Sequence, residues 1–216
     1  MPYDPNRHHR RSIRLKGYDY SQAGAYFITL CTQDRACLFG KVVNGEMRLN
    51  DAGRMVLAEW NRLPERFPHL VLDAFVVMPN HVHGILVITD PAPTVGATVG
   101  ATVGATVATL VVAPTAPTVG NIIGAFKSRV TVEYIRGVKT SGWPPFRGRL
   151  WQRNYYEHII RNERALNAIR QYIMENPRRW HRDREKEARS ASDPLAQAIR
   201  NMPKQEETDH SPGGEP

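Results

Sequence analysis

The sequence has few cysteines and no long apolar run. Its 216 residues contain 2 cysteines, Cys31 and Cys37, which are too few for a disulfide framework and lack the four ligands of a structural zinc site. Outside one low-complexity stretch, no run of about 18 uncharged apolar residues suggests a membrane span. The first residues are basic and polar, without the apolar segment of a signal peptide. We therefore expect a cytoplasmic protein with no membrane partner.

Positive charge is in excess. The chain has 29 Lys and Arg against 21 Asp and Glu, a formal net charge of +8. Such a balance favours a polyanionic partner, because contacts with phosphates supply most of the non-specific affinity for nucleic acid. Charge alone does not establish such a partner, since many basic proteins bind no DNA.

Hydrophobic periodicity predicts an α+β protein. Strands are expected at 25–32, within 41–49, at 70–78, 82–88 and 150–160, and residues 78–81 form a tight turn between two of them. Helices are expected from Asn50 or Asp51 to about 66, from an N-cap at Asn121 to about 135, and from about 162 to a stop near Pro177. This order predicts a ferredoxin-like antiparallel sheet with helices packed on one face, in a single domain.

Composition divides the chain further. Residues 1–15 form a basic arm, and residues 16–181 form the folded domain. Residues 92–120 repeat Thr, Val, Gly and Ala with a period of four, which is typical of a flexible insertion rather than of a solenoid. Residues 182–216 are charged and polar without an apolar face, so we expect a disordered tail.

Two histidines separated by one apolar residue stand at the start of the strand at 82–88. His81 and His83 project to the same face of a strand, and Val82 projects to the other. Two imidazoles on one face present nitrogen ligands to a divalent ion. An isolated pair of this kind can equally be two surface histidines.

The last predicted helix carries a tyrosine and an asparagine one turn apart. Tyr172 and Asn176 are i and i+4 neighbours and share one face of the helix. Taken alone, the pattern fits a tyrosine that covers the sheet and an asparagine that ends the helix before Pro177.

Several blocks together resemble one protein family. The stretch VVMPNHVHGILV at 76–87 resembles the signature of the single-tyrosine transposases of small insertion sequences, and in particular of their REP-associated relatives. LWQRNYYEHIIR at 150–161 resembles the next block of that family, QYIMENP at 171–177 resembles its catalytic helix, and the helix GAFKSRVT at 124–131 also agrees. The resemblance covers roughly residues 16–181, interrupted by the repeat.

The resemblance implies a metal-dependent enzyme that cleaves and rejoins single-stranded or hairpin DNA. His81, His83 and Asn176 would bind Mg²⁺ or Mn²⁺, and Tyr172 would be the nucleophile that forms a 5′-phosphotyrosine. No nucleotide cofactor is implied, and both a monomer and a homodimer are compatible with the family. Tyr155 and Tyr156 compete as nucleophiles, but neither has Asn or Gln at i+4.

Further residues are candidates for a supporting role. Glu157 could add an acidic group near the metal, and His158 could contact DNA or be structural. Candidate DNA contacts, by charge or by stacking, are Arg10, Arg11, Arg14, Lys127, Arg129, Trp151, Arg153, Arg161, Arg178 and Arg179.

Two other functions remain open. The first is a domesticated protein that binds DNA without cutting it, against which the retention of both histidines, the tyrosine and the asparagine argues. The second is a replication initiator or relaxase, although such proteins usually carry additional domains.

Overall fold

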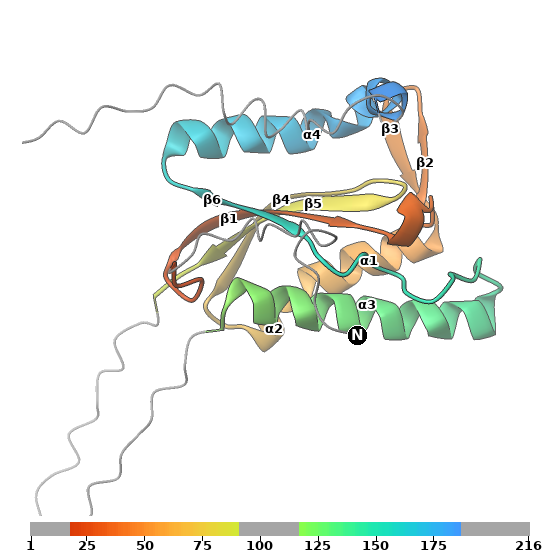
Figure 1. Ribbon diagram of the computed structural model, residues 1–216, viewed down its shortest axis with the longest axis horizontal. Coiled ribbons are helices and arrows are strands. Elements are labelled where there is room, and N and C mark those ends of the chain that lie inside the picture. The colour runs from red at the N-terminus through yellow and green to blue at the C-terminus, as the bar shows by residue number, and fades with distance from the viewer. Residues whose placement is uncertain (1–17, 91–116, 187–216) are drawn as a thin grey trace, which may run out of the picture. The chain divides into compact units, whose positions relative to one another are not determined.

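Four strands form one antiparallel sheet between two layers of helix (Figure 1). The computed structural model describes residues 18–90 and 117–186. The strands are β1 (Gly24–Cys31), β4 (Leu70–Val77), β5 (His81–Ile88) and β6 (Tyr156–Ile160). Their order is β4-β5-β1-β6, so β1 and β5 are the inner strands.

Helices α1 (Asp51–Asn61) and α3 (Val119–Ser141) cover one face of the sheet (Figure 1). Side chains of β1 that point to this face, including Tyr26 and Ile28, join a buried core with Trp60 of α1 and Phe126 of α3. Short elements connect these parts: the helices η1 (Gln33–Arg35) and α2 (Leu63–Arg66) and the hairpin of β2 (Gly40–Val43) and β3 (Glu46–Leu49).

One glycine allows the close approach of α1 to the sheet. Trp60 stacks on Phe75 of β4 with ring centroids 4.2 Å apart, and its indole lies over Gly84 of β5. A Cβ atom at Gly84 would lie 2.5 Å from Cζ2 of Trp60. The glycine that follows the histidine pair is therefore required by packing.

Helix α4 (Glu163–Lys186) lies against the other face of the sheet (Figure 1). The α+β class and the antiparallel sheet with packed helices are as predicted, but the helices occupy both faces. The physical reason is that β5 is buried along nearly its whole length, so both of its faces need a cover. The chain divides into two compact units after Trp180. In the second unit, which begins at His181, the structure describes residues 181–186, and these are helical.

Several element boundaries differ from the prediction. Helix α3 begins after Thr118, which caps it, and Asn121 completes the capping box from the N3 position. Helix α4 does not end near Pro177 but continues through it. A proline there removes one backbone hydrogen bond, and Trp180, one turn later, is buried at 7% exposure, so packing outweighs the local preference.

The remaining boundaries concern strands and residues outside the described ranges. Strand β6 begins at Tyr156, and before it Trp151 makes only an isolated bridge with Thr32. The predicted segment within 41–49 is the β2–β3 hairpin, which turns at Asn44 and Gly45. The basic arm at 1–15, residues 92–116 of the predicted insertion and residues 187–216 of the predicted tail lie outside the described residues. The prediction was wrong at the described ends of both segments, because residues 119–120 begin α3 and residues 182–186 belong to α4. No helix in the described ranges combines the length and the apolar character needed to cross a bilayer.

Candidate active site

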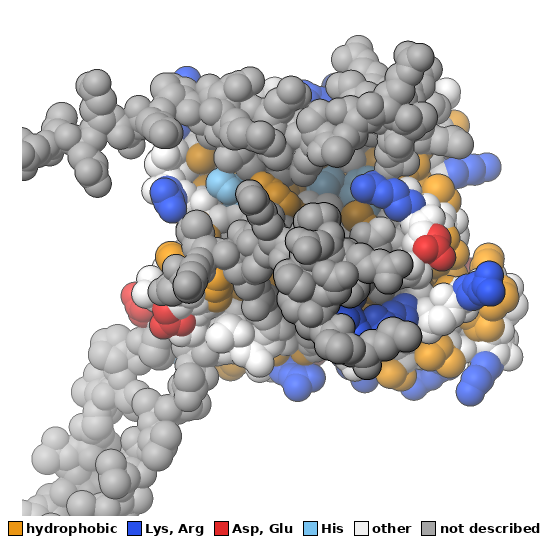
Figure 2. Space-filling view, in the orientation of Figure 1, with side chains coloured by type: hydrophobic (Ala, Val, Ile, Leu, Met, Phe, Trp, Pro, Cys, Tyr) orange, Lys and Arg blue, Asp and Glu red, His pale blue; other side chains and the backbone are white. Residues whose placement is uncertain are grey.

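The two histidines at the start of β5 share one face of the sheet, the face that α4 covers. His81 pairs with Cys31 of β1 and His83 with Thr29, so both side chains project to the same side, as the i, i+2 spacing predicts. Their ring centroids lie 4.6 Å apart, and both residues are at least nine-tenths buried. Figure 2 shows histidine side chains on this side of the molecule, at the level between α4 and the sheet.

In both rings Nδ1, the nitrogen nearer to the backbone, makes a hydrogen bond with a neighbouring side chain. Nδ1 of His81 lies 2.7 Å from Oδ1 of Asn80, and Nδ1 of His83 lies 2.9 Å from Oγ1 of Thr29. The same atom of each ring is thus engaged by a neighbour. The Nε2 atoms are left as the nitrogens that can serve as ligands.

Burial keeps both imidazoles uncharged near neutral pH. It lowers the pKa of His81 to about 4, with a further lowering by the positive charge of Arg35, while the Asn176 side chain acts to raise it. Burial also lowers the pKa of His83 well below its usual value, and charge on His81 adds to this effect. An uncharged imidazole offers the lone pair that a cation needs.

Tyr172 and Asn176 of α4 face this pair. The Tyr172 ring lies 5.3 Å from that of His83 and 6.2 Å from that of Phe27, measured between centroids. One turn later, Asn176 is 1% exposed, and after another turn the Trp180 ring lies 5.9 Å from that of His81. Three residues at i, i+4 and i+8 therefore line the site from above.

The Asn176 amide is a buried polar group without a satisfactory partner. It is close enough to His81 to influence the pKa of that ring, but within the described residues neither its oxygen nor its nitrogen makes a hydrogen bond of ordinary geometry. A contact that shifts a pKa need not satisfy either amide atom with a hydrogen bond. A buried polar group without a hydrogen bond normally lowers the free energy of unfolding by about 1–3 kcal/mol, and in native proteins it often marks a functional site.

These residues are the ones that could hold a divalent ion. The two imidazoles of β5 lie beside each other, and the buried Asn176 amide of α4 contacts one of them, that of His81. Within residues 18–90 and 117–186, no group of three or more His, Cys, Asp or Glu side chains is placed to hold a metal. A three-ligand site here therefore depends on Asn176.

Glu157 does not extend the site. It pairs with Ile28 of β1, and Ile28 points to the face covered by α1 and α3, so the carboxylate lies on the opposite side of the sheet from His83. The idea of an acidic group near the metal is wrong for this residue. His158 pairs with Phe27 and lies on the histidine side, and its half-burial lowers its pKa.

An ion pair that the sequence analysis missed ties α4 to the sheet. Arg170 donates from Nε to Oδ1 of Asp73 at 2.8 Å and from Nη2 to Oδ2 at 2.6 Å. Asp73 lies at an irregularity in the pairing of β4 with β5, between Leu72 and Phe75, where a bulge can redirect a side chain. Arg170 precedes Tyr172 by two residues, so this pair fixes the helix close to the tyrosine. A charged residue within the apolar run 70–78 was the available signal.

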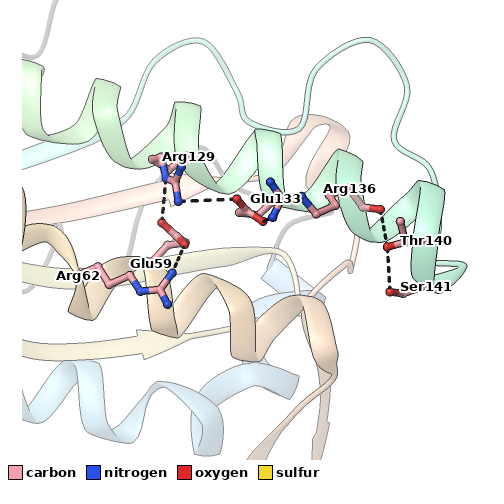
Figure 3. A network of polar contacts seen from close by, with 7 residues as sticks. All are labelled: Glu59, Arg62, Arg129, Glu133, Arg136, Thr140 and Ser141. Carbon is pink, nitrogen blue, oxygen red and sulfur yellow. Dashed lines mark hydrogen bonds and ion pairs between the residues drawn. The ribbon is translucent and has the colours of Figure 1, made fainter.

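Eight of the ten predicted DNA contacts fall into three groups. Arg153, Arg161 and Arg178 are exposed, and so is Arg179, which pairs with Glu175. Arg129 is about half exposed but pairs with Glu59 and Glu133 in a network between α1 and α3 (Figure 3). Three further candidates lie outside the described residues: Arg10, Arg11 and Arg14.

Two candidates have structural roles instead. Trp151 is 4% exposed and packs in the core, with its ring centroid 5.4 Å from that of Phe39, so its ring faces cannot stack on a base. The ammonium of Lys127 donates to the carbonyls of Gln152 and Arg153, at 2.6 and 3.2 Å, and anchors the loop before β6. Neither burial nor this pairing can be read from composition.

Fold and site together describe a ferredoxin-like α+β protein with a buried histidine pair facing a helical tyrosine and asparagine. No family model matches the sequence. An uncharacterized protein of Haemophilus influenzae is 40% identical over 184 residues, which cover 84% of this chain and 95% of the relative. The chain belongs to the family of this Haemophilus protein.

Two solved structures are also similar. One is a REP-associated tyrosine transposase bound to a REP hairpin, with 17% identity over 76% of this chain and 73% of that chain, at a TM-score of 0.44. The other is a candidate transposase from Deinococcus radiodurans, with 18% identity over 76% of this chain and 96% of that one, at a TM-score of 0.39.

Proposed function

We propose that this protein cleaves and rejoins single-stranded hairpin DNA as a tyrosine transposase, with Tyr172 as the nucleophile. The observation that carries the proposal is the convergence of four side chains from two elements. Tyr172 and Asn176 come from one face of α4, and His81 and His83 come from one face of β5. The resemblance of residues 76–87 and 171–177 to the transposase blocks supports the same assignment.

His81, His83 and Asn176 would hold Mg²⁺ or Mn²⁺. A bound divalent ion would polarise the scissile phosphate and stabilise the charge that develops on it. The protein contributes two imidazoles that are already uncharged and an amide oxygen that is already desolvated. Ligands prepared in this way need little rearrangement.

The chemistry assigned to Tyr172 is a direct displacement. Its Oη attacks the phosphorus, the bond from phosphorus to the 3′ oxygen breaks, and the DNA strand remains attached as a 5′-phosphotyrosine. The phenol proton passes to solvent, and the leaving 3′ oxygen takes up a proton. Attack by a 3′-OH on the phosphotyrosine rejoins DNA, so no nucleotide cofactor is needed.

The partner proposed is a DNA hairpin with a short single-stranded segment, the kind of ligand that the resemblance implies. The net charge of +8 suits a polyanion. Exposed arginines at 153, 161 and 178 are the described candidates for phosphate contacts. Both a monomer and a homodimer are compatible with this proposal.

A labelled hairpin assay tests the function. The full chain is incubated with Mn²⁺ and a panel of end-labelled hairpins made from palindromic repeats of the source genome, and adducts that resist SDS are separated by electrophoresis. Tyr172→Phe should abolish the adduct. Tyr156→Phe is the matched control, because Tyr156 also packs beside Phe27, at 6.2 Å between ring centroids, but belongs to strand β6 and not to helix α4. No adduct across the panel, or an equal adduct with Tyr172→Phe, would contradict the proposal.

A further inference from the structure

Asn80, the residue before the histidine pair, is buried in the turn between β4 and β5, and neighbouring segments hold it in place. It is 4% exposed. Its carbonyl accepts hydrogen bonds from the backbone nitrogen and from the hydroxyl of Thr32, both at 2.9 Å. The carbonyl of the preceding Pro79 accepts from the backbone nitrogens of Leu38 and Phe39, at 2.8 and 3.1 Å.

The orientation of the Asn80 side chain follows from its other partner. Nδ2 lies 3.1 Å from the carbonyl oxygen of Arg35. A carbonyl oxygen can only accept a hydrogen bond, so the atom facing it is the amide nitrogen. The amide oxygen therefore faces His81, and it lies 2.7 Å from Nδ1.

This contact decides where the histidine proton resides. An amide oxygen only accepts hydrogen bonds, so Nδ1 of His81 must carry the hydrogen. In a neutral imidazole the other nitrogen, Nε2, then has a lone pair and no hydrogen. His83 has no such constraint from its own partner, because the hydroxyl of Thr29 can donate or accept.

We propose that Asn80 is a positioning residue that fixes His81 in the Nδ1–H tautomer and so presents the bare Nε2 to a cation. The role of this tautomer in metal binding rests on the proposed function, whereas the tautomer itself follows from the contact with Asn80. In the other tautomer a hydrogen on Nε2 would occupy the ligand position, and two acceptors, Nδ1 and the Asn80 oxygen, would face each other 2.7 Å apart. Partners of this kind typically set the tautomer and ring orientation of metal-binding histidines.

The first test measures the tautomer in the metal-free full chain. Long-range ¹H–¹⁵N NMR correlations of the His81 ring show which nitrogen carries hydrogen. Wild type should show hydrogen on Nδ1, and Asn80→Ala should lose this preference. Asn80→Asp should keep the hydrogen on Nδ1, because one carboxylate oxygen accepts in the same place, while its other oxygen cannot replace the donor that faces the Arg35 carbonyl.

The matched control is Asn50→Ala. Asn50 donates to the carbonyl of Leu38 at 2.9 Å and thus supports the same segment from its other side, without touching His81. Its substitution should leave the His81 tautomer unchanged. If Asn80→Ala fails to fold, the wild-type spectrum still decides: hydrogen on Nδ1 supports the inference and hydrogen on Nε2 overturns it.

The second measurement is Mn²⁺ binding by calorimetry, without DNA. Loss of a histidine's supporting partner commonly weakens metal affinity by about 10–100-fold, which we expect for Asn80→Ala, with Asn80→Asp within a few-fold of wild type. Hydrogen on Nε2 in wild type, or an unchanged tautomer in Asn80→Ala, would overturn the inference. Absence of Mn²⁺ binding in wild type with hydrogen on Nδ1 would instead contradict the proposed metal site and leave the tautomer assignment standing.

Discussion

Replacing Asn176 with leucine should stabilise the metal-free protein while removing its response to metal. The Asn176 amide is 1% exposed and makes no hydrogen bond of ordinary geometry within the described residues. An orphaned buried polar group costs about 1–3 kcal/mol, and leucine has the same branching at Cγ without polar atoms, although its methyl groups occupy more space than the amide. The free energy of unfolding of Asn176→Leu should therefore rise by about 1–3 kcal/mol, or roughly 2–4 °C in Tm for each kcal/mol in a chain of this size.

The assay is urea unfolding with and without Mn²⁺. At a metal concentration about 100-fold above Kd, wild type should gain about 2.7 kcal/mol, whereas Asn176→Leu should gain much less. Because leucine also favours helix by roughly half a kcal/mol, a gain larger than this amount is needed to support the orphaned amide. If Asn176→Leu is less stable than wild type without metal, the amide is satisfied in the native protein and the reasoning fails.

Three further predictions concern the sheet and its two helix layers. Asp73→Asn should reduce adduct formation more than DNA binding, because the Asp73–Arg170 pair holds α4 beside Tyr172; equal losses in both assays would contradict this role. Hydrogen bonds from Arg170 lower the pKa of Asp73, so the pair stabilises the folded protein at pH values above the ordinary carboxyl pKa. The difference in Tm between wild type and Asp73→Asn should therefore shrink as the pH falls through the lowered pKa. The free energy of unfolding should also fall between pH 6.5, the ordinary histidine pKa, and about 4, because unfolding lets His81 take up a proton that burial excludes; His81→Gln should flatten this slope, and an unchanged slope would contradict it. Gly84→Ala should destabilise by about 1–3 kcal/mol through overpacking against Trp60, whereas Gly124→Ala, with open space around its Cβ, should not.

Local periodicity predicted the parts of the site that lie within one element. His81 and His83 share a face because strand side chains alternate, and Tyr172 and Asn176 share a face because a helix turns every 3.6 residues. The Asn50 cap and the turn at 78–81 follow from equally local rules.

Contacts between distant segments were not predictable in the same way. Asp73 and Arg170 are 97 residues apart, and the orientation of Asn80 depends on the Arg35 carbonyl 45 residues earlier. The burial of Trp151 was not predictable either, since an aromatic side chain suits both the core and a surface on which bases stack.

Helix α4 shows why local preference misled the prediction of its end and of its layer. Proline at 177 normally stops a helix, but Trp180 gains burial against His81 when the helix continues. The sequence also left open that His81 and His83 are surface histidines, although both rings are buried under this helix.

The central claim is tested most directly by identifying the residue that becomes joined to DNA. The adduct formed by the full chain with Mn²⁺ and a cleaved hairpin is digested with protease and nuclease, and the modified peptide is sequenced by mass spectrometry. The account predicts a 5′-phosphodiester nucleotide on Tyr172. A nucleotide on Tyr155 or Tyr156, or cleavage without any modified tyrosine, would contradict it.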